Sequence, residues 1–293
     1  MTSVDVAVLP VAGLGSRFLP ATKSVPKEML PVVDKPLVAY AVEEALQAGV
    51  REFVFVTSRH KKALEDYFDD HPEMQAELEA AGKAALLQEL RQTRCADASY
   101  HFVRQTEPRG TGDAVWRAKA VVGERPFAVL FPDELLVAPA GEWSALQQLE
   151  RAHARFGLGA LGVLPVDNPQ DYGVVELDGA LNSNGLAHVR HIVEKPKGMA
   201  PSNLAVVGRY VFAAGFMTHL ERIQQTLHGR EVYLTDAIEA ACARGQMNAV
   251  QLQAQRFDCG SKLGYAQANI ALALARPELG APLRAYLSQI LKA

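Results

Sequence analysis

Short apolar runs alternate with helical segments over the first part of the chain, and this alternation restricts the fold more than any other feature. The apolar runs have the length of buried strands and cover residues 5–9, 53–57, 100–104 and 127–131, and helical spacing is present over 35–48, 61–68 and 111–122. The helix over 35–48 is predicted to have Asp34 as its N-cap, Pro36 in its first turn and Gly49 at its end. Strands that are apolar throughout are typical of a parallel sheet covered by helices on both faces. The sequence therefore predicts an α/β fold with a mixed, mainly parallel central sheet flanked by helices.

The second half of the chain is richer in strands. Turn-forming Asn-Pro, Asp-Gly and Asn-Gly pairs separate its apolar runs, which favours antiparallel pairing. The predicted strands cover 159–166, 172–177, 188–194 and 205–212, with 249–257 suited to one more, and the predicted helices cover 215–227, 234–244, 263–275 and 281–291. The charged, alanine-rich stretch 70–97 is predicted to be a helical excursion on the surface. Because no Pro/Gly/Ser-rich linker divides the chain, we expect one continuous domain over 1–293.

Composition argues against several classes of protein. The 293 residues are 49% hydrophobic, which is ample for a buried core, and the net charge is only −3 with no long basic block, unlike a nucleic-acid binder. No apolar stretch approaches the roughly 20 residues of a membrane span, and the N-terminus lacks the basic region of a signal peptide. Cys95, Cys242 and Cys259 are too scattered for a disulfide framework or a clustered zinc site. We expect a cytoplasmic protein that acts on neither nucleic acid nor membrane.

A glycine-containing loop follows the first predicted strand. Gly13 and Gly15 stand where backbone N–H groups can approach an anion without obstruction from side chains. The third glycine of a dinucleotide-binding fingerprint would fall at Phe18, and no Gly-Lys-Ser/Thr follows, so neither familiar phosphate motif is present. A tight strand-to-loop turn is the alternative. Arg17 and Lys27, on a stretch stiffened by three prolines, favour a site for a polyphosphate.

The chain as a whole resembles the nucleotide-diphospho-sugar pyrophosphorylases, and among them the bacterial UTP–glucose-1-phosphate uridylyltransferases. The opening block reads Gly-Leu-Gly-Ser-Arg-Phe-Leu-Pro-Ala-Thr-Lys-Ser-Val-Pro-Lys-Glu-Met-Leu-Pro over residues 13–31. Further blocks that are similar to the family, in the family's order, lie at 104–114, 131–133, 171–175, 193–197, 201–210, 234–238 and 258–262. The resemblance extends over roughly residues 4–287, and is therefore far more specific than any single motif.

The resemblance implies a Rossmann-like fold and a specific reaction. UMP would pass from UTP to glucose 1-phosphate with Mg²⁺ as cofactor, by direct attack of the sugar phosphate on the α-phosphorus, giving UDP-glucose and pyrophosphate. It also implies a nucleotide-binding half over about 1–135, a strand-rich sugar-phosphate-binding half over about 136–262, and C-terminal helices over about 263–293 that suit a homodimer or homotetramer. A thymidylyltransferase that uses dTTP is an alternative. A non-catalytic regulatory relative is a weaker one, because such relatives lose the arginine that stands here as Arg17.

The resemblance also implies roles for particular residues. Asp133 in addition follows an apolar run, and so should stand at the carboxyl end of a strand, where open parallel sheets bind ligands. A lone aspartate there is otherwise a common turn residue. The implied catalytic residues are Arg17, Lys27, Asp133 and Lys195; the nucleotide-binding residues are Ala12, Gly13, Leu14, Gly15, Glu28, Gln105 and Gly112; the sugar-binding residues are Gly173 and Glu194; and the metal ligands are Asp133 and Asp258.

Two features fit this scheme less simply. Asp113 stands where the family commonly has histidine, and we expect its carboxylate to cap the helix that begins there. Glu194 and Lys195 are adjacent on a predicted strand, so alternation would point them to opposite faces. Both can serve one site only if the strand ends or bends before Pro196.

Overall fold

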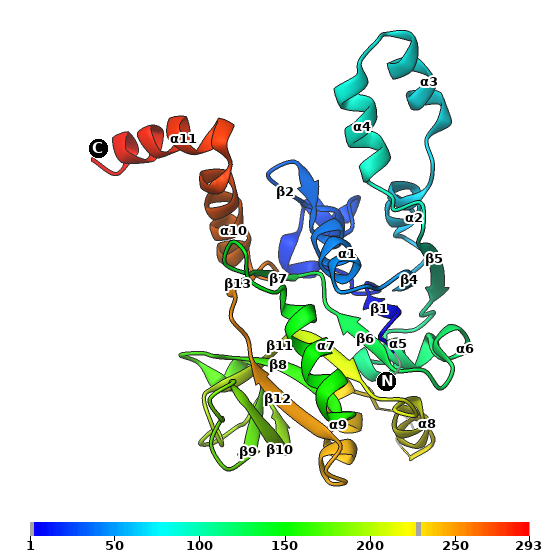
Figure 1. Ribbon diagram of the computed structural model, residues 1–293, viewed down its shortest axis with the longest axis vertical. Helices are drawn as coiled ribbons and strands as arrows, with labels where there is room; N and C mark the ends of the chain where they lie inside the picture. Colours follow the sequence, from blue (N-terminus) through cyan, green and yellow to red (C-terminus); the bar gives the residue numbers. More distant parts are fainter. Residues whose placement is uncertain (1–2, 227–229, 293) are drawn as a thin grey trace.

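A nine-stranded sheet forms the centre of the protein, which a computed structural model describes over residues 3–226 and 230–292 (Figure 1). Its strands are β1 (Val6–Pro10), β4 (Glu52–Thr57), β5 (Ser99–Arg104), β6 (Phe127–Leu130), β8 (Gly159–Pro165), β9 (Gly173–Asp178), β10 (Leu186–Glu194), β11 (Leu204–Phe212) and β12 (Met247–Gln251). They are ordered β5-β4-β1-β6-β11-β8-β12-β10-β9. The predicted α/β class with a mixed sheet is confirmed.

The two halves of the sheet pair differently. Strands β5, β4, β1 and β6 are all parallel. Strand β11 is antiparallel to both of its neighbours, β6 and β8, and β10 is antiparallel to β12 and β9. Because parallel strands end on one edge, the segments after β1, β5 and β6 meet there, and this is where an open sheet binds its ligands.

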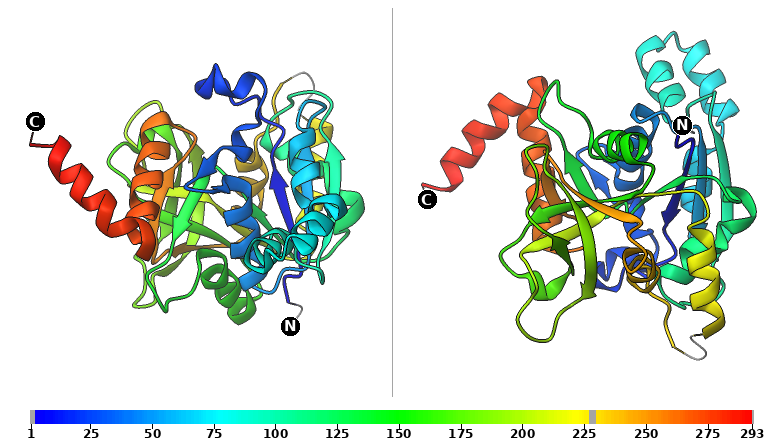
Figure 2. Two further views of the ribbon diagram at one scale, coloured as in Figure 1. Left: turned by 90° about the horizontal axis from the view of Figure 1, so that it is seen from above. Right: turned by 60° about the horizontal axis from the view of Figure 1, so that its bottom comes forward.

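Helices cover both faces of the sheet (Figure 2). One face packs against α1 (Leu37–Gln47), α2 (Lys62–Phe68) and α7 (Ala145–Phe156). The other packs against α5 (Thr111–Arg117), α6 (Lys119–Val122), α8 (Met217–Thr226) and α9 (Leu234–Cys242). Strand side chains that alternate between the faces fill both cores, with Phe53 and Phe55 in one and Val54 and Val56 in the other. Burial of these apolar surfaces is the main term that stabilises the sheet.

Two helical pairs extend from this body. Helices α3 (Pro72–Ala80) and α4 (Ala84–Gln92) carry no buried residue, which confirms the predicted surface excursion. Helix α10 (Lys262–Ala275) packs beside β13 (Gln255–Asp258), which pairs with β7 (Glu134–Val137), and α11 (Pro277–Ile290) then projects away from the body (Figure 1). A short hairpin joins β2 (Pro31–Val32) to β3 (Lys35–Pro36), and single 3-10 turns lie at Ser16–Phe18, Ala21–Lys23, Lys27–Met29 and Pro169–Asp171.

Several local predictions were wrong. Helix α1 begins at Leu37 with Pro36 at its N-cap position, and Asp34 instead forms an ion pair with Arg276. The single strand expected over 249–257 is two strands, β12 and β13, and the helix expected over 111–122 breaks at Ala118. Helix α7 was missed, although Ser144 and Gln147 form the capping box that begins it. The last residue of the helix expected over 215–227 lies outside the described residues.

Within residues 3–226 and 230–292, no helix has both the length and the apolar character required to cross a membrane.

Candidate active site

The loop after β1 is folded around the side chain of Lys27. Gly15 has a φ of 67°, a left-handed conformation that favours glycine, and its carbonyl oxygen accepts a hydrogen bond of 2.7 Å from Thr22 Oγ1. A Cβ added to Gly15 would lie 3.1 Å from Lys27 Cβ, and one added to Gly13 would lie 3.8 Å from Lys27 Cε. The loop backbone therefore lies directly against the lysine side chain.

Arg17 and two aspartates meet at Gly260. Arg17 lies in the first 3-10 turn and is exposed, while the neighbouring Phe18 anchors the turn by an edge-on contact of 5.5 Å with Tyr265. A Cβ added to Gly260 would lie 3.0 Å from Asp258 Oδ1, 3.3 Å from Asp133 Oδ2 and 3.6 Å from Arg17 Nη1. These three side chains, predicted from three distant parts of the sequence, therefore face the same small space.

Lys27 joins this cluster through Asp133, which follows the end of β6. Its Nζ lies 2.5 Å from Asp133 Oδ2. Burial alone would lower the pKa of Lys27, but the charges of Asp133 and Glu28 outweigh it and raise the pKa above its ordinary value. Burial alone would raise the pKa of Asp133, and the charge of Lys27 reverses this, so the pKa lies below its ordinary value. Both groups are therefore charged near neutral pH.

The pairing of β7 with β13 brings the two aspartates together. Asp258 faces Glu134 in the register of this pair, and the Cys259 N–H donates a hydrogen bond of 2.8 Å to the Asp133 carbonyl oxygen. Glu134 also accepts two hydrogen bonds from Arg256, at 2.6 and 2.7 Å. Sequence reasoning gave no role to Glu134 or Arg256, because each strand of this pair is only four residues long.

A buried ion pair between Arg209 and Glu44 holds the segment that carries Asp133. Arg209, 1% exposed, donates to both carboxylate oxygens of Glu44 at 2.9 to 3.1 Å. Its remaining N–H groups donate to the carbonyl oxygens of Phe131, Gly208 and Glu134. A guanidinium with all these acceptors is well satisfied inside the protein, and it fixes the backbone on both sides of Asp133. Apart from the position of Arg209 in a family-like block, no local pattern predicts this pair.

Glu28 lies beside Lys27 but points inward. Its side chain is 1% exposed, and one oxygen accepts a hydrogen bond of 2.6 Å from Lys61 Nζ. The other oxygen, Oε1, is buried and has no partner among the described residues. Direct contact between this carboxylate and a nucleotide would therefore require the side chain to leave its buried position, and the nucleotide contact of Glu28 stays a prediction.

Gln105 and the start of α5 follow the end of β5. The Gln105 side chain donates to the Gly110 carbonyl oxygen at 3.0 Å and to Asp113 Oδ2 at 2.8 Å. Asp113 is fully buried and makes no capping hydrogen bond, and Gly110 occupies the N-cap position. The expected cap at Asp113 was therefore wrong: its carboxylate is engaged by side chains instead.

Gly112 touches the backbone of the segment before α9. Its N–H donates to the Val232 carbonyl oxygen at 2.8 Å, and a Cβ added to it would lie 2.8 Å from the Tyr233 carbonyl oxygen. We expect Gly112→Ala to lower the free energy of unfolding by about 1–3 kcal/mol, since two backbone segments would have to separate. Gly198→Ala is the matched control, because nothing lies within 4 Å of a Cβ there. Urea unfolding measures both variants, and equal stability of the two would contradict this packing.

Gly173, Glu194 and Lys195 come together where β9 and β10 pair. Gly173 faces Glu194 in the register, and a Cβ added to it would lie 3.1 Å from Glu194 Oε2. Strand β10 ends at Glu194, and Lys195 adopts a φ of 45° while its N–H donates to the Tyr172 carbonyl oxygen at 3.0 Å. The strand therefore ends before Pro196, as both residues require in order to serve one site. Burial raises the pKa of Glu194, and Lys195 partly opposes this.

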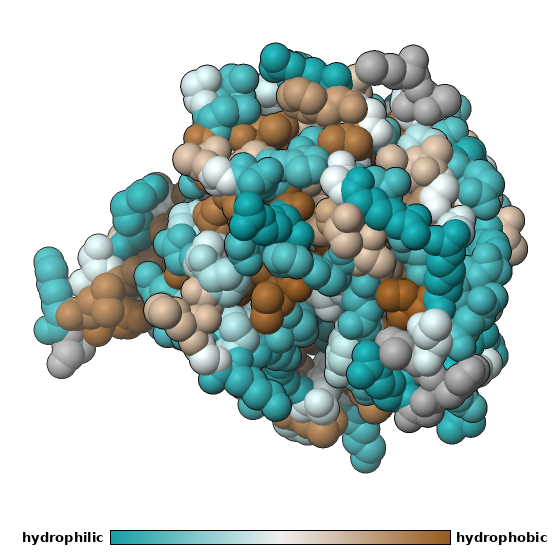
Figure 3. All heavy atoms as spheres, turned by 90° about the horizontal axis from the view of Figure 1, so that it is seen from below, coloured by the Kyte–Doolittle hydropathy of each residue, from teal (hydrophilic) through white to brown (hydrophobic). Residues whose placement is uncertain are grey.

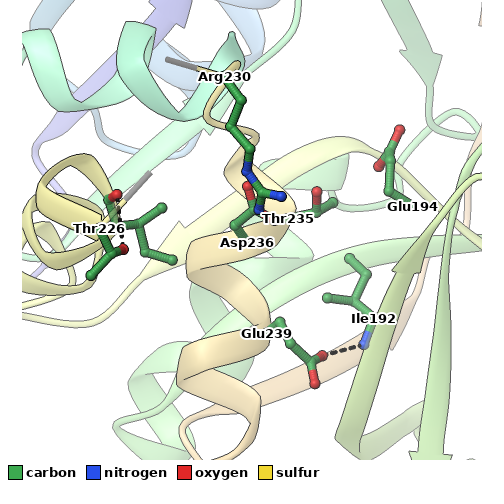
Figure 4. A pocket seen from close by; sticks show the side chains of 8 residues that line it. Ile192, Glu194, Thr226, Arg230, Thr235, Asp236 and Glu239 are labelled. Atoms are coloured by element: carbon green, nitrogen blue, oxygen red, sulfur yellow. Dashed lines mark hydrogen bonds between the residues drawn. The ribbon is translucent and has the colours of Figure 1, made fainter. Parts of the chain in front are cut away.

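A pocket of about 290 Å³ opens beside Glu194. Figure 4 shows Glu194 at one side, Thr235 and Asp236 at the start of α9, and Arg230 extended toward them. Thr235 also lies 3.6 Å, through its Cγ2, from the position of a Cβ at Gly173. The family-like block 234–238 pointed to this segment, but sequence reasoning gave it no role.

Contacts connect this pocket to the aspartate cluster. The Arg256 guanidinium lies 4.6 Å from the centre of the Tyr172 ring, and Arg256 pairs with Glu134, next to Asp133. On the other side, the Leu234 N–H donates to Thr111 Oγ1 at 3.0 Å, which joins α9 to α5. Glycine loop, aspartates and pocket thus belong to one connected framework.

Comparison with known proteins places this framework in a family. The family model described as nucleotidyl transferase matches residues 6–273, which include every predicted site residue. The chain belongs to the nucleotidyl transferase family. It is 41% identical over 293 residues to a UTP–glucose-1-phosphate uridylyltransferase of Staphylococcus epidermidis, with 99% of each chain covered. The resemblance seen in the sequence is therefore confirmed.

Solved nucleotidyl transferase relatives share the fold. A UDP-glucose pyrophosphorylase of Acinetobacter baumannii is 41% identical, with a TM-score of 0.90 and 98% of this chain and 99% of that chain covered. A UTP-bound structure of the enzyme from A. baumannii is also 41% identical, with a TM-score of 0.88 and 97% and 98% coverage. The central sheet and its helices thus follow a nucleotidyl transferase that holds UTP.

Asp133 and Asp258 suit a magnesium ion in a nucleotidyl transferase. Magnesium takes one or two carboxylates from a protein and completes its coordination with phosphates and waters. Across the described parts of the chain, no three His, Cys, Asp or Glu side chains are grouped as a metal cage. Two carboxylates therefore fit an ion shared with a polyphosphate and do not fit a structural metal site. Asp133 Oδ2, which faces Gly260, also pairs with Lys27, so a bound metal would share this oxygen with the lysine or displace it.

Proposed function

We propose that this nucleotidyl transferase transfers UMP from UTP to glucose 1-phosphate and releases pyrophosphate and UDP-glucose. The observation that carries this proposal is the 41% identity, over 99% of each chain, to a UTP–glucose-1-phosphate uridylyltransferase. The cluster of Arg17, Lys27, Asp133 and Asp258 beside the glycine loop supplies the charges that such a reaction needs.

The reaction needs positioning more than a protein nucleophile. A phosphate oxygen of glucose 1-phosphate attacks the α-phosphorus of UTP, the bond from that phosphorus to the β-bridging oxygen breaks, and pyrophosphate leaves with the electron pair. The attacking oxygen is already an anion near neutral pH, so the main barrier is the approach of two anions. Cations held in place before the reaction lower this barrier.

The cations have different roles in this proposal. Arg17 stabilises charge on the α-phosphoryl group and on the leaving pyrophosphate, where its planar fork can donate to two oxygens. Lys27 holds the leaving pyrophosphate, and Lys195 contacts the phosphate of the sugar. Asp133 and Asp258 would hold Mg²⁺, which neutralises phosphate charge when it is bound.

The remaining predicted residues surround the two substrates. The loop backbone contacts the phosphates and ribose of the nucleotide through Ala12, Gly13, Leu14 and Gly15. The base lies between this loop, Gln105 and Gly112. Leu14 is 78% exposed at the tip of the loop, as expected for a segment that covers a ligand. Gly173 leaves room for the hexose, Glu194 accepts hydrogen bonds from its hydroxyl groups, and Glu28 supports Lys27 from the interior.

An assay of pyrophosphate release tests this proposal. Purified protein receives glucose 1-phosphate with UTP, dTTP, CTP, ATP or GTP, each with Mg²⁺ or with a chelator. We expect turnover with UTP and Mg²⁺ that the chelator abolishes. Turnover with dTTP equal to or above that with UTP would identify a thymidylyltransferase instead. Binding of UDP-glucose without turnover of any nucleotide would identify a non-catalytic relative.

Assembly and location complete the proposal. We propose that the C-terminal helices build a homodimer or homotetramer, because α11 projects with apolar side chains on its surface (Figure 3). Tyr286, Ile290 and Leu291 are 59%, 48% and 84% exposed there. Light scattering on the purified protein gives the mass that decides between these states.

The three cysteines all carry free thiols, which suits the reducing cytoplasm.

A further inference from the structure

The buried carboxylate of Asp113 has no role in the mechanism above, yet it accepts four hydrogen bonds. Asp113 is 0% exposed. Oδ2 accepts from Gln105 Nε2 at 2.8 Å and from Arg117 Nε at 3.4 Å, and Oδ1 accepts from Arg117 Nη2 at 3.3 Å and Gln224 Nε2 at 3.0 Å. A buried carboxylate is costly without such donors, and these four hydrogen bonds offset that cost. Asp113 also stands where the resembled family commonly has histidine.

Asp113 and Gly110 together determine how the Gln105 carboxamide is oriented. A carboxamide has both of its donor hydrogens on nitrogen and accepts hydrogen bonds only through oxygen. Here one end of the group lies between two acceptors, the Gly110 carbonyl oxygen at 3.0 Å and Asp113 Oδ2 at 2.8 Å. Only the NH₂ end can satisfy both. The opposite orientation would place Oε1 against two oxygen atoms and lose both hydrogen bonds.

The oxygen of Gln105 is thereby left as an available acceptor. No described residue donates a hydrogen bond to Gln105 Oε1. This oxygen is nevertheless not a buried unsatisfied atom, so it must be accessible from outside the protein. Since Gln105 as a whole is 9% exposed, this oxygen accounts for part of its exposed surface. Gln105 follows β5, and its N–H is fixed by a 2.9 Å hydrogen bond to the Thr57 carbonyl oxygen at the end of β4. The acceptor therefore stands on the sheet edge where the nucleotide is proposed to bind.

We propose that Asp113 is a positioning residue for base recognition, which holds the Gln105 carboxamide with its oxygen toward the base. The acceptor then takes a pyrimidine whose N3 carries a hydrogen and rejects cytosine, whose N3 is itself an acceptor. Uracil and thymine share this N–H, so the contact separates both from cytosine and does not separate them from each other. The inference rests on the proposed function, specifically on the base lying beside Gln105.

Asp113→Asn tests the orientation directly. The asparagine keeps the size of the side chain but can present a donor as well as an acceptor to Gln105, so the carboxamide is no longer fixed. We expect the ratio of kcat/KM for UTP to kcat/KM for CTP to fall on the order of tenfold, through the loss of a hydrogen bond that rejects the wrong base. Gln105→Ala should lower the same ratio. In the double variant, Asp113→Asn should change the ratio no further, because Asp113 acts through Gln105.

Gln224→Leu is the matched control. Its amide donates at 3.0 Å to Asp113 Oδ1, which is the oxygen that does not bond to Gln105. The leucine removes one hydrogen bond to Asp113 but leaves the hydrogen bond that orients the Gln105 carboxamide. We therefore expect the UTP to CTP ratio of Gln224→Leu to match that of the unsubstituted protein.

The outcomes separate the inference from the function on which it rests. If Gln105→Ala lowers the ratio while Asp113→Asn reduces UTP and CTP turnover in parallel, the positioning role is overturned and the base site stands. If neither variant alters the ratio while UTP is turned over, the base does not lie at Gln105, and both proposals of its contacts fail.

A second measurement needs no folded Asp113 variant. In the unliganded protein both Nε2 hydrogens of Gln105 are hydrogen-bonded, so their NMR signals, assigned with Gln105→Ala, should exchange slowly with solvent. Exchange as fast as that of exposed glutamines would overturn the proposal.

Discussion

Replacing Arg17 with alanine is expected to lower kcat for UDP-glucose formation roughly 10²- to 10³-fold, or about 3–4 kcal/mol of transition-state stabilisation. Arg17 Nη1 faces the same space as the Asp133 and Asp258 carboxylates, and across residues 3–226 and 230–292 it forms no ion pair that would commit it elsewhere. Its charge is therefore free for phosphate. Because the charge on the leaving pyrophosphate develops during the reaction, kcat should fall more than KM rises.

Steady-state kinetics with UTP and glucose 1-phosphate measure this effect. Arg17→Lys keeps a charge but loses the planar fork, and we expect an intermediate rate. Lys23→Ala is the matched control, because it removes an exposed cation from the same loop, and its rate should stay within about twofold of the unsubstituted protein. The exposed position of Arg17 predicts unchanged stability. A rate for Arg17→Ala close to that of Lys23→Ala would refute its role.

Asp133→Asn is expected to reduce turnover about 10³-fold at low Mg²⁺ and to raise the Mg²⁺ concentration needed for half-maximal rate. The substitution removes a metal ligand of the hard oxygen type that magnesium prefers. It also removes the larger of the two charges that keep the pKa of Lys27 high, so that burial should lower this pKa with only the charge of Glu28 still opposing it. The residual activity of Asp133→Asn should therefore decline as pH rises, because Lys27 loses its proton there.

A magnesium titration of turnover at several pH values checks both effects. Asp258→Asn should also raise the magnesium requirement, and the two substitutions should combine non-additively because the two carboxylates face one space. Asp66→Asn, which removes an exposed carboxylate on α2, controls for the change in net charge. An unaltered magnesium requirement in Asp133→Asn would exclude it as a ligand.

Local patterns in the sequence determined most of the fold. The apolar runs that became β1, β4, β5 and β6 were visible because a strand buried on both faces is apolar throughout. Gly13, Gly15 and the aspartate after β6 were visible for similar reasons, since a glycine-rich turn, in which Gly15 has a positive φ, and a strand end both have local signatures. The failures were also local: Asp34 resembles an N-cap, but an ion pair with Arg276 uses it instead.

Family resemblance extended these predictions to the site. It selected Asp258, Gly173, Glu194 and Lys195, none of which could be chosen from periodicity, and the structure places each beside another predicted residue. It gave no role to Arg209, Glu44 and Arg256, whose ion pairs hold the segments around Asp133, or to Thr235, which lines the pocket beside Glu194.

The sequence by itself thus determined most of the segments that form strands and helices, the position of the glycine loop and the family that the chain resembles. Only the tertiary structure decided that β13 pairs with β7 and so brings Asp258 to Asp133. It also decided that the Arg209–Glu44 pair holds the backbone on both sides of Asp133, and that Asp113 accepts a hydrogen bond from Gln105 and does not cap its helix. Local preferences are set by neighbours along the chain, and sequence patterns record them. Contacts between distant segments depend on how the sheet and helices pack, so the residues that make them carry no signature of their own.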